Sequence, residues 1–327
     1  MSLDADTIVD RRRMRRKLTF WRVLTFLVAA VAIGAAATYS SWRGGVGGSP
    51  AAGTIARVKI SGLIRGNQDR VEALERLGRS KVDAVIVHID SPGGTTAGSE
   101  QLHDALLELK AKKPMVVVVD GLAASGGYMA AVAADHIVAQ SASLIGSIGV
   151  LFQYPNFADA LKTIGVKVEE VKSSPLKAAP NGFEPTSPEA RAAISAIVMD
   201  SYEWFKGLVK NGRKLDDTQL AQVSDGRVFT GRQALGLKLV DELGNEKTAI
   251  AWLAKEKGID PKLPVRDYPL SSRFRDLPFL HVAAIGLLDT IGLTAVVRRL
   301  EESGWIASVE RLNLDGVLAL WHPQPTD

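Results

Sequence analysis

Residues 115–128 read MVVVVDGLAASGGY, and this stretch decides the fold class. The run at 115–119 consists of apolar, mostly β-branched residues, which is typical of a strand buried on both faces of a sheet. Small residues dominate 124–134, which we predict to be a closely packed helix. A buried strand is therefore followed almost at once by a helix, and Ser125 lies at the junction.

The same alternation of apolar runs and helical patterns continues on both sides of this stretch. The predicted strands are 55–60, 84–89 and 115–119, and the predicted helices are 70–79, 99–111, 124–134 and 187–210. Continuous apolar strands that alternate with helices indicate an α/β fold, with a parallel sheet covered on both faces. Such folds carry their chemistry at the carboxyl ends of the strands. Here glycine-rich turns follow two strands, at 91–94 and 121–127, and we predict the functional site there.

Composition and charge exclude several classes of protein. Of the 327 residues 46% are apolar, so a substantial core can form, and the complete absence of cysteine excludes disulfides, thiolate metal sites and a cysteine nucleophile. The net charge of +4 is accounted for by residues 1–22, which hold seven lysines and arginines against three aspartates. The rest of the chain is neutral overall, so we do not expect nucleic acid as a partner.

The N-terminal region has the pattern of a membrane anchor. We predict a basic cytoplasmic leader at 1–18, a transmembrane anchor at 19–42 and a glycine-rich linker at 43–53. The cationic flank is expected to stay in the cytoplasm, which places the remaining chain on the other side of the membrane. A cleavable signal peptide is the alternative, because the alanines at 35–37 suit a signal peptidase. We favour the uncleaved anchor.

Ser125 is the candidate nucleophile. At the amino end of a helix, unpaired backbone N–H groups can stabilise the oxyanion formed when a serine attacks a carbonyl. A helix-capping serine is the alternative role, and Ala123 leaves the Gly-x-Ser-x-Gly motif incomplete. The five histidines are interpreted as structural, and no His-Glu-x-x-His metal motif occurs; they are His88, His103, His136, His281 and His322.

Without a catalytic histidine, the general base would be another group, and a lysine can serve when desolvation lowers its pKa. Lys177 is a lone cation among small and apolar neighbours, and Lys172 is its rival. In the turn at 91–94 the glycines let backbone N–H groups approach a substrate carbonyl, although the same residues suit a tight turn. Ser147 is a second serine with a positioning or turn role.

Taken together, these residues resemble a known family, the bacterial signal peptide peptidases of the SppA type, which are membrane-anchored Ser-Lys proteases. The resemblance covers roughly residues 55–255 and rests on blocks in the family's order and spacing: Asp90-Ser91-Pro92-Gly93-Gly94, Ala124-Ser125-Gly126-Gly127-Tyr128, Gly146-Ser147-Ile148-Gly149-Val150, Lys177, and Asp225-Gly226-Arg227-Val228-Phe229-Thr230-Gly231 followed by 234–244. It implies a Clp protease/crotonase-like fold of stacked ββα units, with the peptidase domain at 54–262. Each motif occurs once, as in the half-length form of the family.

The resemblance also implies roles for individual residues. Ser125 would be the nucleophile and Lys177 the general base, the amides of Gly94 and Gly126 would form the oxyanion hole, and Ser147 and Tyr128 are possible positioning residues. Half-length members take serine and lysine from neighbouring subunits, which implies a homo-oligomer, specifically an octamer. No cofactor or metal is implied.

The expected function is a serine endopeptidase of the bacterial cytoplasmic membrane, with its catalytic domain on the exported side, that degrades cleaved signal peptides and misfolded exported proteins. Peptides would bind extended, by strand addition. The alternatives are a crotonase-like acyl-CoA enzyme and a catalytically inactive membrane scaffold. The tail at 263–327 is predicted to be amphipathic, and its apolar segment 317–321 suits a peptide groove, including the protein's own.

Overall fold

The computed structural model describes residues 20–21, 52–270 and 317–320. The chain divides into two compact units, Met1–Ser49 and Pro50–Asp327, and the fold below concerns the second. The predicted leader, nearly all of the predicted anchor and linker, and most of the predicted tail lie outside the described residues. Among the helices that are described, none combines the length and apolar character needed to cross a bilayer.

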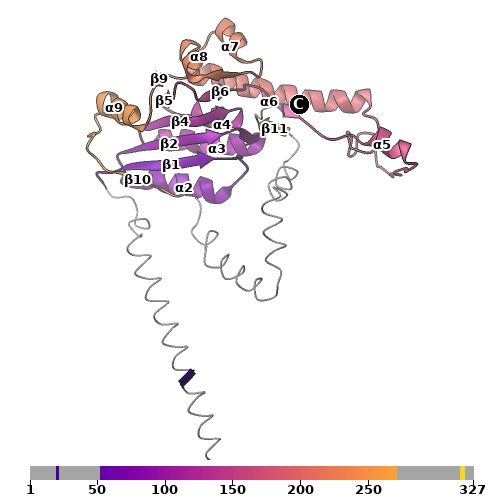
Figure 1. Ribbon diagram of the computed structural model, residues 1–327, viewed down its shortest axis with the longest axis horizontal. Helices are drawn as coiled ribbons and strands as arrows, with labels where there is room; N and C mark the ends of the chain where they lie inside the picture. Colours follow the sequence, from indigo (N-terminus) through magenta and orange to yellow (C-terminus); the bar gives the residue numbers. More distant parts are fainter. Residues whose placement is uncertain (1–19, 22–51, 271–316, 321–327) are drawn as a thin grey trace, which may run out of the picture. The chain divides into compact units, whose positions relative to one another are not determined.

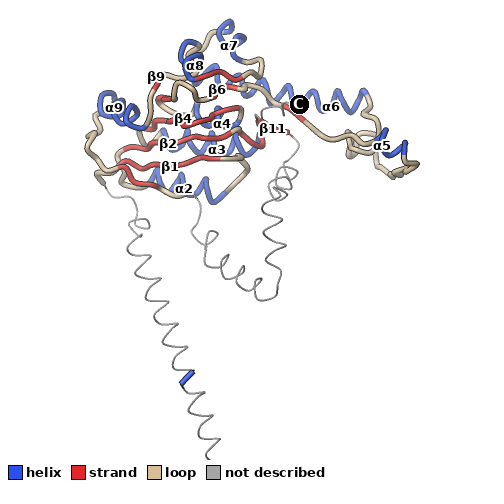
Figure 2. The backbone as a smooth tube through the Cα atoms, viewed as in Figure 1, coloured by secondary structure: helices blue, strands red, loops and turns tan. Residues whose placement is uncertain are grey.

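The second unit alternates strands and helices along the chain (Figures 1 and 2). The strands are β1 (Ile55–Ser61), β2 (Ala84–Ser91), β3 (Gly93–Thr95), β4 (Met115–Ala124), β5 (His136–Ala139), β6 (Leu144–Gly146), β7 (Leu151–Phe152), β8 (Val228–Thr230), β9 (Glu242–Leu243), β10 (Val265–Asp267) and β11 (Val317–Leu320). The helices are α2 (Gln68–Arg79), α3 (Thr96–Lys110), α4 (Gly126–Ala131), α5 (Ala158–Thr163), α6 (Pro188–Arg213), α7 (Asp217–Val223), α8 (Gly231–Gly236) and α9 (Glu246–Lys257).

The main sheet confirms the predicted α/β class. Its strands run in the order β10-β1-β2-β4-β5-β9, and every neighbouring pair in that path is parallel. The carboxyl end of β4 pairs with β6 in parallel, and β6 pairs with β8 antiparallel. In Figure 1 the central strands lie side by side, with β4 and β2 in the middle. Parallel neighbours bring the carboxyl ends of β2 and β4 to the same edge of the sheet.

Both faces of the sheet are buried, which explains the uninterrupted apolar runs. Val117 and Val119 of β4 point into a large core that also includes side chains of α2, α3, α4 and α6. Val116 and Val118 point to the opposite face, where they pack with Leu253 of α9. Because successive side chains of a strand point to opposite faces, a strand covered on both sides is apolar at nearly every position.

The predicted and observed elements differ most around the two glycine-rich turns. The strand predicted to end at residue 119 continues to Ala124, and helix α4 begins only at Gly126 and ends at Ala131. The turn expected at 91–94 contains a short strand, β3. This strand forms because Ile64 pairs with Gly94. The Ile64 N–H donates to the Gly93 carbonyl and the Thr95 N–H donates to the Ile64 carbonyl, each at 2.9 Å.

A second, smaller sheet has the strand order β3-β11-β7 and is antiparallel. Its central strand is β11 (Val317–Leu320), from the C-terminal part of the chain. The predicted strand at 317–321 is thus confirmed for the four residues described, and it lies between two other strands of the same chain, whereas a peptide groove at this place stays a prediction.

Residues 153–187, which we call the arm, connect β7 to α6 and include α5. In Figure 1 the arm lies beyond the end of α6 that is distant from the sheet. The arm exposes many large apolar side chains, namely Phe157, Ile164, Val166, Val168, Val171, Leu176 and Phe183. The arm therefore exposes more large apolar side chains than any other described segment of similar length.

Candidate active site

Ser125 has the least ordinary backbone at the carboxyl edge of the sheet. It separates β4 from α4 with φ 54° and ψ −119°, a conformation that side chains other than glycine seldom adopt and that costs about 1–3 kcal/mol. Its N–H is held by the carbonyl of Gly146, at 2.8 Å. The Ser125 hydroxyl is buried and makes no hydrogen bond within the described part of the chain. It also does not cap α4, which argues against the capping role.

The two predicted turns lie against each other. Ser91, at the end of β2, pairs with Ala123 of β4, two residues before Ser125. A Cβ atom on Gly127 would come within 2.6 Å of the Ser91 carbonyl oxygen, so only glycine permits this approach of α4 to β2. The sequence-based prediction that the site lies at these two turns therefore has a geometric basis.

The two candidates for the oxyanion hole, Gly94 and Gly126, are close in sequence to Ser91 and Gly127, which make this contact. Gly94 approaches Ile64 so closely that a Cβ atom would lie 1.7 Å from the Ile64 carbonyl oxygen. The two bonds between Ile64 and β3 use the N–H groups of Ile64 and Thr95, and neither uses that of Gly94. Gly126 is the first residue of α4, where backbone N–H groups have no partner within the helix. Their oxyanion role stays a prediction.

Ser147 follows the residue that holds Ser125. It has φ 51°, and its N–H donates to the Arg227 carbonyl at 2.8 Å. Gly146, with φ 107°, is the residue whose carbonyl accepts from Ser125. Gly146 and Ser147, both with positive φ, thus connect the Ser125 backbone to the segment before β8. A positioning role for Ser147 is compatible with this placement and stays a prediction.

Tyr128 is a fully buried core residue. Its hydroxyl donates to the Leu239 carbonyl at 2.8 Å, and burial raises the pKa of Tyr128 well above its usual value, so the phenol stays neutral. This placement favours a structural role over a role in positioning substrate.

We expect Tyr128→Phe to lower the free energy of unfolding by about 1 kcal/mol, because it removes one buried hydrogen bond, and to leave peptidase activity within about twofold. Denaturant unfolding and peptide hydrolysis measure the two effects. A loss of hydrolysis without a loss of stability would instead assign Tyr128 to the reaction.

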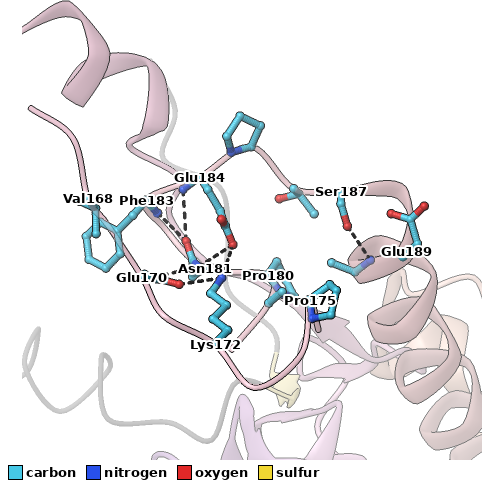
Figure 3. Close-up of a pocket in the computed structure, with 14 residues that line it drawn as sticks. Val168, Glu170, Lys172, Pro175, Pro180, Asn181, Phe183, Glu184, Ser187 and Glu189 are labelled. Carbon is cyan, nitrogen blue, oxygen red and sulfur yellow. Dashed lines mark hydrogen bonds and ion pairs between the residues drawn. The ribbon is translucent and has the colours of Figure 1, made fainter. Parts of the chain in front are cut away.

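The two candidate lysines, Lys172 and Lys177, both lie in the arm, and their surroundings in the structure differ. Lys172 forms ion pairs with Glu170 and Glu184, each at 2.6 Å, in the cavity drawn in Figure 3. Its hydrogen bonds to Glu170 and Glu184 raise the pKa of Lys172, so this lysine remains protonated at neutral pH and is unsuited to act as a base. Lys177 is exposed, and within one chain it does not bond to Ser125.

The described histidines make structural contacts, as predicted. His103 is buried and bonds through Nδ1 to the Met129 carbonyl at 2.7 Å, and its burial lowers its pKa. His88 bridges Asp120 and Glu246, at 3.0 and 2.9 Å, and does not bond to Ser125. Among the described residues, no cluster of histidine and acidic side chains suits a metal ion.

The space between strands β3 and β7 that β11 fills, which we call the groove, was only partly predicted. Strand β11 lies between β3 and β7, with Ala319 opposite Gly94 and Leu318 opposite both Thr95 and Leu151. One wall, at Gly94, was identified from the sequence, and the other, β7, was missed. Its only signal is the apolar pair Leu151 and Phe152 after the block at 146–150. An extended segment therefore runs antiparallel through the groove, past a candidate oxyanion donor.

A buried serine on a strained strand-to-helix turn, beside a groove that holds an extended strand, defines the site of a serine peptidase. The model of the family described as "Peptidase family S49" matches residues 108–260. "Putative protease slr0021" of Synechocystis sp. is 37% identical over 209 residues, which cover 63% of this chain and 76% of that protein. The chain belongs to peptidase family S49, a family of serine proteases, as its sequence led us to expect.

Two further similarities complete the comparison. "Putative signal peptide peptidase SppA" of Enterococcus faecium is 31% identical over 193 residues, which cover 58% of this chain and 56% of that protein. Among solved structures, a point mutant of ClpP1 from Listeria monocytogenes aligns with 58% of this chain and 91% of that chain, at 18% identity and a TM-score of 0.39.

Proposed function

We propose that this chain is a membrane-anchored serine endopeptidase that degrades cleaved signal peptides and misfolded exported proteins with a Ser-Lys dyad. The observation that carries the proposal is Ser125, whose buried hydroxyl lacks a partner among the described residues and whose backbone is strained at the end of β4. Strain and unpaired polar groups persist in a stable fold where function needs them.

In the proposed reaction, the Ser125 Oγ bonds to the scissile carbonyl carbon and passes its proton to the neutral amine of Lys177. The amides of Gly94 and Gly126 stabilise the oxyanion. Lysine then gives the proton to the leaving nitrogen as the C–N bond breaks. Water hydrolyses the acyl ester in the second half, giving its proton to Lys177 and restoring the Ser125 hydroxyl.

The dyad is proposed to form between subunits. Lys177 is carried by the arm, which exposes apolar side chains and is distant from the sheet in Figure 1. If the arm packs on a neighbouring subunit, the same contact covers its apolar side chains and desolvates the lysine, which a general base at neutral pH requires. A closed ring repeats this contact at every subunit, and we propose an octamer.

Substrate is proposed to bind as an added strand between β3 and β7, in the position of β11. The pairing of Ala319 with Gly94 suggests that the residue in Ala319's place precedes the scissile bond. This residue is small in β11. The printed name of the Enterococcus faecium relative, signal peptide peptidase, supports the substrate class. The uncharged stretch at 23–39, after a cationic leader, supports a single membrane anchor with the catalytic domain on the exported side.

Mixing two inactive variants tests the shared dyad. Ser125→Ala and Lys177→Ala should each lose at least about a thousandfold in hydrolysis of an unstructured apolar peptide. Subunits refolded together in equal amounts should regain about a quarter of wild-type activity, because one site in four then pairs an intact serine with an intact lysine. Lys172→Ala, in the same arm, is the matched control and should remain active.

Three outcomes would contradict parts of the proposal. Hydrolysis that survives Ser125→Ala would exclude this serine as the nucleophile. Two inactive variants that never complement would place both groups of the dyad in one subunit. A wild-type protein that binds peptides but cleaves none would favour the scaffold, and turnover of an acyl-CoA thioester would favour the crotonase-like alternative.

A further inference from the structure

Next to the groove, the end of β7 and the residues after it line a cavity that has no role in the proposed reaction. The cavity has a volume of about 430 Å³ and lies between the end of β7 and the start of α6. Its lining residues are Phe152, Gln153, Tyr154, Asn156, Thr186 and Arg191. None of them is acidic, and one of them is a cation.

The strand register leads a bound peptide into this cavity. Val317 of β11 lies opposite Phe152, and Leu318 lies opposite Leu151, so the strand runs antiparallel to β7. A peptide in the place of β11, extended by two residues in its N-terminal direction, would reach about 7 Å further and lie opposite Gln153 and Tyr154. Both of these residues line the cavity.

Arg191 is the charged group of the lining, and no partner for its side chain occurs among the described residues. The Tyr154 hydroxyl bonds to Thr186, and the Asn156 side chain bonds to the Glu184 carbonyl at 3.0 Å and to the Ala158 N–H at 2.9 Å. The guanidinium of Arg191 makes no ion pair or hydrogen bond with any other residue that the structure describes. Tyr154 and Asn156 are thus held in place, whereas Arg191 is available to a ligand.

The local electrostatics favour an anion. Arg191 lies in the first turn of α6 (Pro188–Arg213), where the helix dipole adds positive potential. Two acidic residues are close to Arg191 in sequence. Glu184 is engaged by Lys172, at 2.6 Å, and Glu189, in the same turn of α6, lines the other cavity, drawn in Figure 3. A carboxylate that enters the cavity therefore meets an unpaired guanidinium, which binds carboxylates through two parallel hydrogen bonds.

We propose that Arg191 forms a distal subsite that selects substrates with an aspartate or glutamate four residues before the residue opposite Gly94. This inference rests on the proposed peptidase function and deepens it, because it names a sequence preference remote from the scissile bond. The chain's own sequence has an acidic residue at the corresponding distance, Asp315, two residues before Val317. Selectivity would thus come from charge at the far end of the groove.

The subsite is tested on the full-length protein with peptides that have the sequence of residues 311–322. The peptides differ only at the position of Asp315, which holds Asp, Asn or Lys. Wild type should cleave the Asp peptide about two- to fivefold faster in kcat/KM than the Asn peptide, the range expected of an exposed charge pair. The preference should shrink as salt is raised. Arg191→Gln should abolish the preference and Arg191→Glu should turn it toward Lys, while Arg232→Gln, an exposed arginine on α8, should leave it unchanged.

Binding of the same peptides to Ser125→Ala, followed by fluorescence anisotropy, separates the subsite from catalysis. If no peptide is cleaved by wild type, the proposed function fails, yet an Asp preference in binding that Arg191→Gln removes would still establish the subsite. The subsite would be overturned if wild type cleaved and bound the Asp and Asn peptides equally well, or if Arg191→Glu still preferred the Asp peptide.

Discussion

Replacing Ser125 with glycine should abolish peptide hydrolysis and at the same time make the protein more stable. Hydrolysis should fall by at least about a thousandfold, because the nucleophile is lost. Stability should rise by about 1–2 kcal/mol, because glycine adopts φ 54° without strain and a buried hydroxyl that has no partner within its own subunit disappears. A residue retained only for packing would not combine these two effects.

We expect Ser125→Gly to be the most stable protein, Ser125→Ala the next and wild type the least stable. This order separates the contribution of backbone strain from that of the hydroxyl. Alanine removes the hydroxyl but keeps the Cβ at positive φ, so it should give only part of the gain. Thermal and denaturant unfolding of the three proteins measures the order. Ser99→Ala is a matched control at another buried serine, whose hydroxyl donates to the Thr95 carbonyl at 2.9 Å, and it should be destabilising. If Ser125→Gly is less stable than wild type, the strain argument is wrong.

Gly94→Ala should have the second largest effect, on activity and stability together. The new Cβ would lie 1.7 Å from the Ile64 carbonyl oxygen, and since that atom belongs to the backbone, β3 or the segment at Ile64 has to move. We expect a loss of about 2 kcal/mol or more in stability. Activity should fall about a hundredfold or more, as expected when one oxyanion donor is displaced.

Gly207→Ala is the same chemical change, and we expect it to change stability in the opposite direction. Gly207 lies within α6, and apart from its chain neighbours and the nearby backbone of its own helix no described atom lies within 4 Å of the position its Cβ would take. Alanine should therefore raise stability by about 0.5–1 kcal/mol through helix propensity and leave hydrolysis unchanged. Equal effects of the two substitutions would refute the argument from close approach at Gly94.

The parts of the fold that depend on local pattern were predictable from the sequence. Apolar runs identified β2 and β4 because a strand covered on both faces is apolar at most positions, and His88 is the one polar residue within 84–89. The first turn of α6 was predictable from Ser187 and Pro188, since Ser187 accepts from the Ala190 N–H as an N-cap. These signals lie within a few residues of the structure they specify.

Features that depend on distant partners were not predictable in the same way. Gly93–Thr95 forms a strand only because Ile64 and β11 pair with it, and glycine itself disfavours strands, so the segment reads as a turn. The ion pairs of Lys172 involve Glu170 and Glu184, and the second of these is brought near by the fold of the arm. The proposed desolvation of Lys177 has its origin in another copy of the chain, which a single sequence does not display.

One consequence of the sheet order concerns how this unit is used as a building block. Ile55 of β1 is paired with Val265 of β10, so the first and the last strand of the main sheet are adjacent at one edge of that sheet. A domain whose ends meet can be inserted into, or joined to, other sequences without disturbing its core. Here, however, the chain returns after β10 as β11, which pairs with β3 at Gly94, so a transferred unit has to keep the sequence that connects β10 to β11 for the catalytic edge to stay as it is.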